Sequence, residues 1–178
     1  MKNNERGVKG FILSFRCAIA GIISGIVNER NLRIHIIAAI YVLYFSTFYE
    51  FTRGEYILLV MTICLVITTE MLNTAIEAAV DLVTEQYAPY AKAAKDIAAG
   101  AVLASAIFAI AVGFILFWDT AVFAEIFMYF TTSPIRGVLL ALSILCAFLF
   151  VLKIGRWAKK ADQHYGYKNG GTNVQHQK

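Results

Sequence analysis

Three carboxylates and one amide recur at helical spacing in one apolar segment: Glu70, Asn73, Glu77 and Asp81. At roughly 100° per residue they fall at about 0°, 300°, 340° and 20° around a helix, so they share one narrow stripe. Like charges in such a stripe repel each other unless a cation or a basic group lies beside them. Ionisable side chains within membrane-type helices are rare and usually functional. The stripe therefore requires a metal ion, a proton or a basic partner.

Three kinds of function fit this stripe. Phosphoryl transfer needs Mg²⁺, a basic group beside the phosphate oxygens and a carboxylate that takes the acceptor's proton. Glu29 and Glu77 offer oxygen ligands of the kind that Mg²⁺ prefers. Lys95 offers the positive charge, and Glu70 a carboxylate that faces a lipid hydroxyl. A cation or proton pathway, or a purely structural stripe between packed helices, would use the same residues, and the residue pattern alone leaves all three open.

Other kinds of site have little support in the sequence. It contains no phosphate-binding glycine loop, no dinucleotide fingerprint, no zinc-protease motif and no nucleophile elbow. Its three histidines are isolated from one another. Its three cysteines are scattered and give neither a disulfide framework nor metal-ligand spacing. No nucleic-acid partner is expected.

The composition is that of an integral membrane protein. Of 178 residues, 59% are hydrophobic and only 16% are charged, and the mean hydropathy is +0.64. These values are too apolar for a soluble domain of this length. The sequence has two prolines and lacks the alternating segments of a membrane β-barrel. We therefore expect an all-α membrane bundle.

The chain divides into four parts. Residues 1–28 predict an amphipathic helix on the membrane surface. Residues 29–119 hold three spans, at about 34–51, 55–83 and 97–118; the third carries small residues, among them Ala98 and Ser105, that permit close helix contact. A polar connection, interrupted by Pro89, separates the second span from the third. Residues 120–155 predict an interfacial helix and a fourth span, and residues 156–178 a basic tail.

Positive charge predicts the orientation of these spans. Fourteen lysines and arginines lie in the N-terminal arm, in the loop after the second span or in the C-terminal tail, and the two opposite loops hold one each, Arg53 and Arg136. The positive-inside rule then places both termini in the cytoplasm. Glu70 is expected within the cytoplasmic half of the bilayer, with Glu77 and Asp81 near the interface, where nucleotides are available.

Two motifs together resemble the prokaryotic diacylglycerol kinase and undecaprenol kinase family. The first is Glu70-x-x-Asn73-Thr-Ala-Ile-Glu77-x-x-x-Asp81, and the second is Ala94-Lys95-Asp96-x-x-Ala-Gly-Ala-Val102. Asn28-Glu29 matches a third element, before the first span. The resemblance covers residues 10–118 and implies a homotrimer of small three-span subunits with active sites between subunits. It also implies a location in the bacterial cytoplasmic membrane.

The resemblance implies a role for each matching position. Glu70 resembles the general base, and Glu29 and Glu77 resemble the ligands of the Mg²⁺ that accompanies ATP. The remaining matches resemble nucleotide contacts or supporting polar residues: Asn73, Asp81, Gln86, Tyr87, Lys95 and Asp96. Structural alternatives are that Asp96 caps the third helix and that Asp81 forms an ordinary ion pair with Lys95.

The expected acceptor is the primary hydroxyl of a membrane lipid. The segment Asn28-Glu-Arg-Asn-Leu-Arg-Ile-His35 resembles the undecaprenol kinase branch, so undecaprenol is the first choice and diacylglycerol the second. A transporter that uses the carboxylate stripe is the alternative of another class, and a pseudokinase or assembly protein is a third. The chain departs from the family after residue 119, where it adds a fourth span and a tail.

Overall fold

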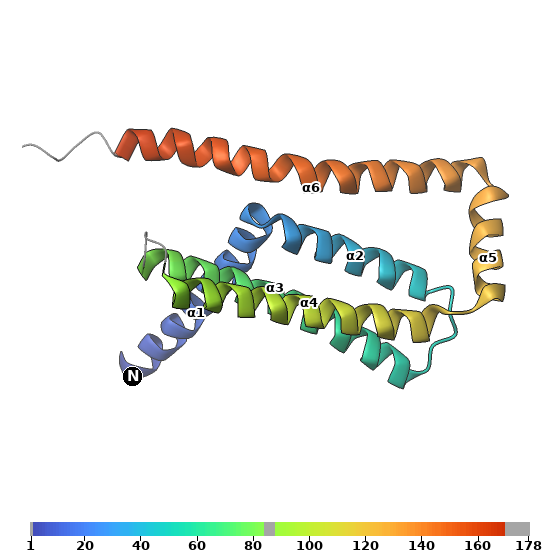
Figure 1. Ribbon diagram of the computed structural model, residues 1–178, viewed down its shortest axis with the longest axis horizontal. Helices are drawn as coiled ribbons and strands as arrows, with labels where there is room; N and C mark the ends of the chain where they lie inside the picture. Colours follow the sequence, from blue (N-terminus) through green and yellow to red (C-terminus); the bar gives the residue numbers. More distant parts are fainter. Residues whose placement is uncertain (1, 84–87, 170–178) are drawn as a thin grey trace, which may run out of the picture. The chain divides into compact units, whose positions relative to one another are not determined.

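The computed structural model describes the backbone of residues 2–83 and 88–169 and the side chains of residues 8–83 and 88–152. Every element in these ranges is an α-helix (Figure 1). The chain divides into two compact units, residues 1–30 with 149–178, and residues 31–148. The helices, in chain order, are α1 (Lys2–Asn28), α2 (Arg30–Ser46), α3 (Arg53–Val83), α4 (Pro89–Phe117), α5 (Thr120–Thr131) and α6 (Pro134–Asn169).

Four described stretches are long and apolar enough to cross a membrane: Val8–Asn28, Arg53–Val83, Pro89–Phe117 and Pro134–Leu152. The predicted all-α membrane fold and its additional C-terminal apolar helix are therefore confirmed. Helix α2 has 17 residues, which is at the short end of the usual range for a span. The stretch from Val8 to Asn28 is also apolar enough to cross, and its expected place on the membrane surface stays a prediction.

Several helix boundaries differ from the sequence-based expectation. Helix α2 ends at Ser46, so the aromatic residues that follow lie in the connection to α3 rather than in a span reaching residue 51. Helix α4 begins at Pro89, eight residues before the expected start of the third span, and α6 continues through residue 156 to Asn169. Proline is well suited to a first helical position because it lacks an N–H and its φ is already helical. The preceding Ala88 is extended, with φ −123° and ψ 122°, as a residue before proline prefers.

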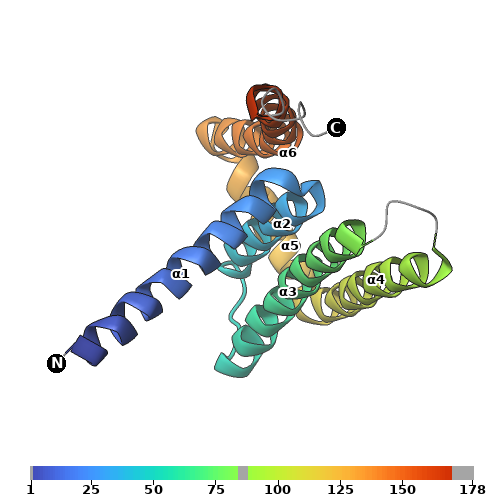
Figure 2. The same cartoon turned by 90° about the vertical axis from the view of Figure 1, so that its left-hand side faces the viewer.

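In residues 31–148 the most extensive helix pair is α3 with α4, which lie side by side (Figure 2). Buried positions along α3 recur every three or four residues, as expected for one packed face: Leu59, Thr62, Val66 and Glu70. On α4 the buried positions are Ala98, Ser105 and Val112. Most other large apolar side chains of both helices are exposed, which suits contact with lipid or with a further helix.

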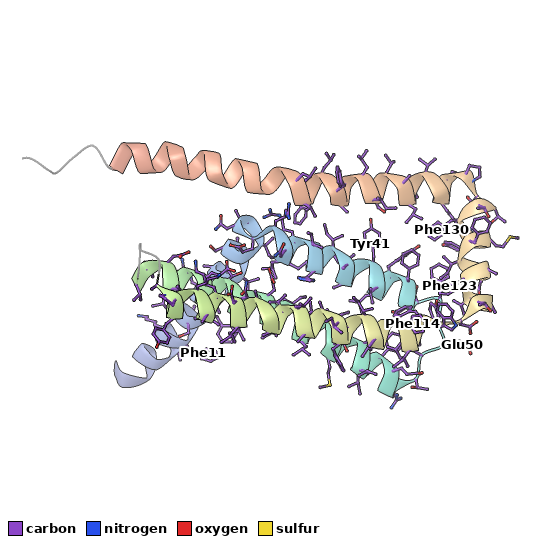
Figure 3. All side chains as sticks on the ribbon, viewed as in Figure 1. Phe11, Tyr41, Glu50, Phe114, Phe123 and Phe130 are labelled. Atoms are coloured by element: carbon purple, nitrogen blue, oxygen red, sulfur yellow. The ribbon has the colours of Figure 1, made fainter. Side chains whose placement is uncertain are left out.

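Aromatic side chains join the end of α2 to α5. Phe48 meets Tyr129 edge-on, with ring centroids 5.1 Å apart, and Phe45 meets Phe130 at 6.3 Å. The Arg136 guanidinium lies 4.2 Å from the centre of the Tyr129 ring. One turn earlier on α2 lies Tyr41 (Figure 3). Its hydroxyl is 3.0 Å from the Ser143 hydroxyl of α6. These contacts attach α5 and the first part of α6 to α2.

The other unit contains α1, and its described side chains from Val8 to Ser24 are exposed. Phe11 and Phe15 are one helical turn apart, and their ring centroids are separated by 4.8 Å (Figure 3). The Ser14 hydroxyl donates to the carbonyl oxygen of Gly10 at 3.0 Å, so this hydroxyl is satisfied within the helix. The exposed apolar side chains of α1 are consistent with a helix in contact with a membrane.

A buried tyrosine ties the connection between α2 and α3 to the end of α4. Tyr49 is 8% exposed, and its hydroxyl donates to the Phe117 carbonyl oxygen at 3.0 Å. Burial, and secondly the negative charge of Asp119, raise the pKa of Tyr49. A raised pKa in the folded state means that this group stabilises the fold fully below the unfolded pKa of about 10 and loses that contribution as pH rises through the folded pKa.

Tyr49→Phe is therefore expected to remove part of the alkaline sensitivity of the protein. At neutral pH the lost hydrogen bond should cost about 1 kcal/mol of unfolding free energy. Above about pH 10 the difference from wild type should shrink, because only the wild type then has a buried phenol to ionise. Thermal unfolding of both proteins in detergent, at pH 8 and above pH 10, measures this difference.

Tyr56→Phe is the matched control. It removes a hydrogen bond from the hydroxyl of a more exposed tyrosine to the Ser46 carbonyl oxygen. An unchanged difference across this pH range would contradict the prediction.

Candidate functional site

The predicted stripe lies along the second half of α3, and its burial decreases toward the end of the helix. Glu70 is 2% exposed, on the same face as Val66 one turn earlier. Glu77 is half-buried and Asp81 is exposed. At 1.5 Å per residue Glu70 and Glu77 are about 10 Å apart along the helix axis. One helix thus presents a buried carboxylate and a more accessible one on the same face.

The amide of Asn73 links the middle of this stripe to Glu77. Its Nδ2 donates to Glu77 Oε1 at 3.0 Å. Its Oδ1 is buried and has no hydrogen-bond partner among the described residues. A buried acceptor without a partner is uncommon and indicates an ion, a water molecule or a ligand group that completes it. The Asn73 amide oxygen and the Glu77 carboxylate therefore belong to two hydrogen-bonded side chains, and both oxygens can act as metal ligands.

This pair satisfies the chemical requirement for Mg²⁺ that the family resemblance implies. Mg²⁺ binds oxygen, and proteins often hold it with only one or two carboxylates together with substrate phosphates. No group of three or more histidine, cysteine, aspartate or glutamate side chains close enough to hold a metal occurs in the part of the chain that the structure describes. The oxygens of Asn73 and Glu77 are of the kind that Mg²⁺ binds.

Lys95 of α4 forms an ion pair with Asp81 of α3, with 2.5 Å between Nζ and Oδ1. The two side chains are 35% and 66% exposed, so solvent screens the pair and it adds little to stability. It places a cationic group beside the end of the carboxylate stripe, as expected. Asp96 lies beyond the first turn of α4 and is exposed. The alternative that Asp96 caps this helix is therefore wrong, because the cap position is Ala88.

Three of the predicted site residues are not placed beside the stripe by the described part of the structure. Glu29 lies between α1 and α2, is half-buried, and belongs to the unit formed by residues 1–30 and 149–178. Its backbone N–H donates to the Gly25 carbonyl oxygen at 2.8 Å. Gln86 and Tyr87 lie outside the described residues. The roles of these three residues stay predictions.

A cavity of about 170 Å³ lies between α2, α3 and α4 in residues 31–148. Its lining includes Val66, one helical turn from Glu70 on the same face of α3. Small side chains, among them Ala38, Ala39 and Gly113, leave this space, and the only polar side chains that line it are His35 and Thr62. The cavity lies along the face of α3 that also carries Glu70. Because it is apolar, it is suited to a hydrocarbon chain.

The sequence placed Thr74 beside the stripe but did not single out Thr69 or its contact with Ser105. Thr69 Oγ1 is 2.8 Å from Ser105 Oγ across the contact between α3 and α4. Thr74 Oγ1 donates to the Glu70 carbonyl oxygen at 3.1 Å. From the sequence, Ser105 was expected only to permit close helix contact as a small residue. Helical periodicity within α3 does not show which residue of α4 faces Thr69.

Comparison with known proteins bears on most of this site. The sequence model of the prokaryotic diacylglycerol kinase family matches residues 16–117. The chain is 41% identical over 113 residues to a diacylglycerol kinase of Synechocystis sp., a match that spans 65% of that relative's length and 63% of this chain.

Two further relatives are matched over nearly their whole length. The chain is 38% identical over 116 residues to an undecaprenol kinase of Bacillus subtilis, spanning 94% of that protein and 65% of this chain. It is 30% identical over 119 residues to a diacylglycerol kinase of Escherichia coli, spanning 98% of that protein and 67% of this chain. The family match includes Glu29, α3 and the whole of α4, whereas α5 and α6 lie beyond its end.

Proposed function

The chain belongs to the prokaryotic diacylglycerol kinase family, a family of membrane lipid kinases, and from this premise we propose that it phosphorylates the primary hydroxyl of undecaprenol with MgATP as donor. The observation that carries the proposal is the stripe on α3, where buried Glu70 is followed by the oxygen pair of Asn73 and Glu77. Diacylglycerol is the second candidate acceptor. The relatives, which are named as kinases, give no support to the transporter alternative.

Glu70 is the proposed general base. It accepts the proton of the lipid hydroxyl while the lipid oxygen forms a bond to the γ-phosphorus of ATP. The bond from that phosphorus to its bridging oxygen breaks, and ADP leaves. Burial supports this role, since a carboxylate excluded from water keeps a fixed position and has few water molecules to displace when the lipid hydroxyl approaches. The cavity is lined by Val66, which lies one turn from Glu70 on the same face of α3. This cavity suits the hydrocarbon chain that carries the hydroxyl.

The nucleotide is proposed to bind toward the other end of the stripe. Glu77, with Asn73 beside it and Glu29 as the second carboxylate, would hold Mg²⁺. When bound, this metal neutralises phosphate charge and orients the γ-phosphoryl group. Lys95 supplies a cation for the phosphate oxygens, and its pairing with Asp81 holds the ammonium near the stripe. Asp96, Gln86 and Tyr87 are the remaining proposed nucleotide contacts.

The proposed assembly and orientation follow the family and the distribution of charge. Both termini, the start of α2 and the start of α4 are placed on the cytoplasmic side of a bacterial inner membrane because these parts carry 14 of the 16 lysines and arginines. A homotrimer is proposed, with a site shared between subunits. The exposed apolar side chains of α3 and α4 leave room for such subunit contacts.

A lipid-panel assay tests the acceptor. We expect the purified full-length chain, given labelled ATP and Mg²⁺, to phosphorylate undecaprenol with a kcat/KM at least about tenfold above that for diacylglycerol, because discrimination is set by differential binding in the transition state. A Glu70→Gln preparation made in the same way reports the background from contaminating kinases. A higher kcat/KM for diacylglycerol would exchange the two acceptors. Phosphorylation of no lipid, together with ion flux in liposomes, would overturn the kinase proposal itself.

A further inference from the structure

The α3 position directly before Glu70 is joined to α4 by a hydroxyl pair, the half-buried Thr69 and the buried Ser105. Thr69 Oγ1 lies 2.8 Å from Ser105 Oγ, and Ser105 is 6% exposed. Thr69 Oγ1 also lies 3.0 Å from the carbonyl oxygens of both Leu65 and Val66. Ser105 Oγ lies 2.8 Å from the Val102 carbonyl oxygen. The pair therefore contacts the backbone of both helices.

The hydroxyl protons make this contact directional. Each hydroxyl has one proton to donate, whereas the pair has acceptors on the backbone of α3, on the backbone of α4 and on the other hydroxyl. If Thr69 donates to its own helix, then Ser105 must donate to Thr69 to keep the bond between the helices. If Ser105 donates to the Val102 carbonyl oxygen, Thr69 must donate to Ser105. The bond between the helices therefore forms when one hydroxyl donates to the other and that second hydroxyl donates to its own backbone.

A second bond fixes the same helix pair at its other end. The pair formed by Asp81 and Lys95 lies 12 residues from Thr69 along α3 and ten residues from Ser105 along α4, which is about 18 Å and about 15 Å of helix. Glu70, Asn73 and Glu77 all lie between these two bonds. The two side chains of the ion pair are 35% and 66% exposed, so solvent screens it. The hydroxyl pair is less exposed, and it is the bond nearer to Glu70.

We propose that Thr69 and Ser105 are positioning residues. Their hydrogen bond fixes how far α3 is shifted along its axis and how it is rotated relative to α4, and thereby fixes the position of the Glu70 carboxylate. This inference rests on the proposed lipid kinase function. The carboxylate extends from the backbone next to Thr69, so a shift or rotation of α3 at the hydroxyl pair moves it relative to the lipid hydroxyl. A displacement of about 1 Å at a reacting group costs on the order of 10² in rate. Glu77, the proposed metal ligand, lies eight residues, about 12 Å, beyond Thr69 along α3 and is affected less.

The test compares variants that remove the hydroxyl with variants that keep it. Thr69→Val keeps the branched shape but loses the hydroxyl, and Ser105→Ala loses it from the other side. Both are expected to lower kcat about ten- to hundredfold, with KM for MgATP changed by less than about twofold. Thr69→Ser retains a hydroxyl at the same place and should keep most of the wild-type kcat. The double variant Thr69→Val with Ser105→Ala should lose no more than the stronger single variant, because the two residues act through one bond.

Ser143→Ala is the matched control for loss of an interhelical hydroxyl bond. Ser143 Oγ lies 3.0 Å from the Tyr41 hydroxyl and 2.8 Å from the Leu140 carbonyl oxygen, the same pattern as Ser105. Ser143 is exposed, so this control should lower thermal stability no more than Ser105→Ala does and should leave kcat unchanged. An active wild type whose Thr69→Val and Ser105→Ala variants keep full kcat would overturn the positioning role alone. Equal losses of kcat in Thr69→Val and Thr69→Ser would also overturn it. A wild type that phosphorylates no lipid would overturn the proposed function and this inference with it.

Discussion

Glu70→Gln is expected to lower kcat for lipid phosphorylation by about 10²–10⁴ while leaving the affinity for MgATP close to that of the wild type. The amide has nearly the shape of the carboxylate but cannot take the proton of the lipid hydroxyl. Glu70 is 2% exposed, and it is about 10 Å along the helix from Glu77. The change therefore removes a proton acceptor without removing a proposed metal ligand. Turnover and equilibrium nucleotide binding are measured on one detergent-purified sample.

The fold should tolerate this substitution. An amide is less costly than a charge to keep in a buried place, so the melting temperature is expected to be unchanged or higher. Glu125→Gln, an exposed carboxylate on α5 outside the family match, is the matched control and should keep full activity. Near-normal turnover in Glu70→Gln would remove this residue from the chemistry. Loss of nucleotide binding and of the native oligomer together would give it a structural role instead.

Glu77→Gln is expected to raise the Mg²⁺ concentration needed for half-maximal activity by at least about ten- to hundredfold, with partial recovery at high Mg²⁺. Substitutions around metal sites commonly have effects of this size, and loss of a negatively charged ligand should be no milder. The substituted side chain still has an amide oxygen that can accept the hydrogen bond from Asn73 Nδ2. Local structure is therefore retained while the charge is lost. Mg²⁺ titrations of activity and of nucleotide binding measure the effect.

Glu29→Gln provides the parallel test for the second proposed ligand. It should shift the Mg²⁺ dependence in the same direction, because both carboxylates are proposed to share one metal. Asp81→Asn is the contrasting variant: it removes the partner of Lys95 and should act on nucleotide affinity without shifting the Mg²⁺ requirement to the same degree. Ordinary Mg²⁺ dependence and full activity in both glutamate variants would show that the metal assignment is wrong.

The sequence by itself determined that the chain is a helical membrane protein and that four polar residues share one face of a helix. Both follow from local properties. Hydropathy depends on composition over the length of a span, and the common face of Glu70, Asn73, Glu77 and Asp81 follows from the repeat of 3.6 residues per turn. The family resemblance came from the same short-range spacing, and the match over residues 16–117 confirms it.

Helix ends were less accurately predicted because hydropathy does not mark them. Charged and polar residues near Lys92 and Lys95 resembled a loop, yet α4 begins at Pro89. Proline is tolerated at a first helical position, where its missing N–H has no partner to lose. In the same way α2 ends at Ser46 although aromatic residues continue beyond it. Of these residues, Phe48 packs against α5, whereas Tyr49 and Phe51 pack against Phe117 of α4. No pattern within α2 specifies these contacts.

Only the tertiary structure decided which residues meet between helices. Lys95 forms an ion pair with Asp81, which was one of the alternatives that the sequence left open. Thr69 contacts Ser105, and no sequence argument proposed this contact. The tertiary structure also placed an apolar cavity next to Val66 and left the Asn73 amide oxygen buried without a partner among the described residues. The physical reason is that helical periodicity fixes angles within one helix, whereas the axial setting and rotation of α4 against α3 depend on the packing of all side chains between them.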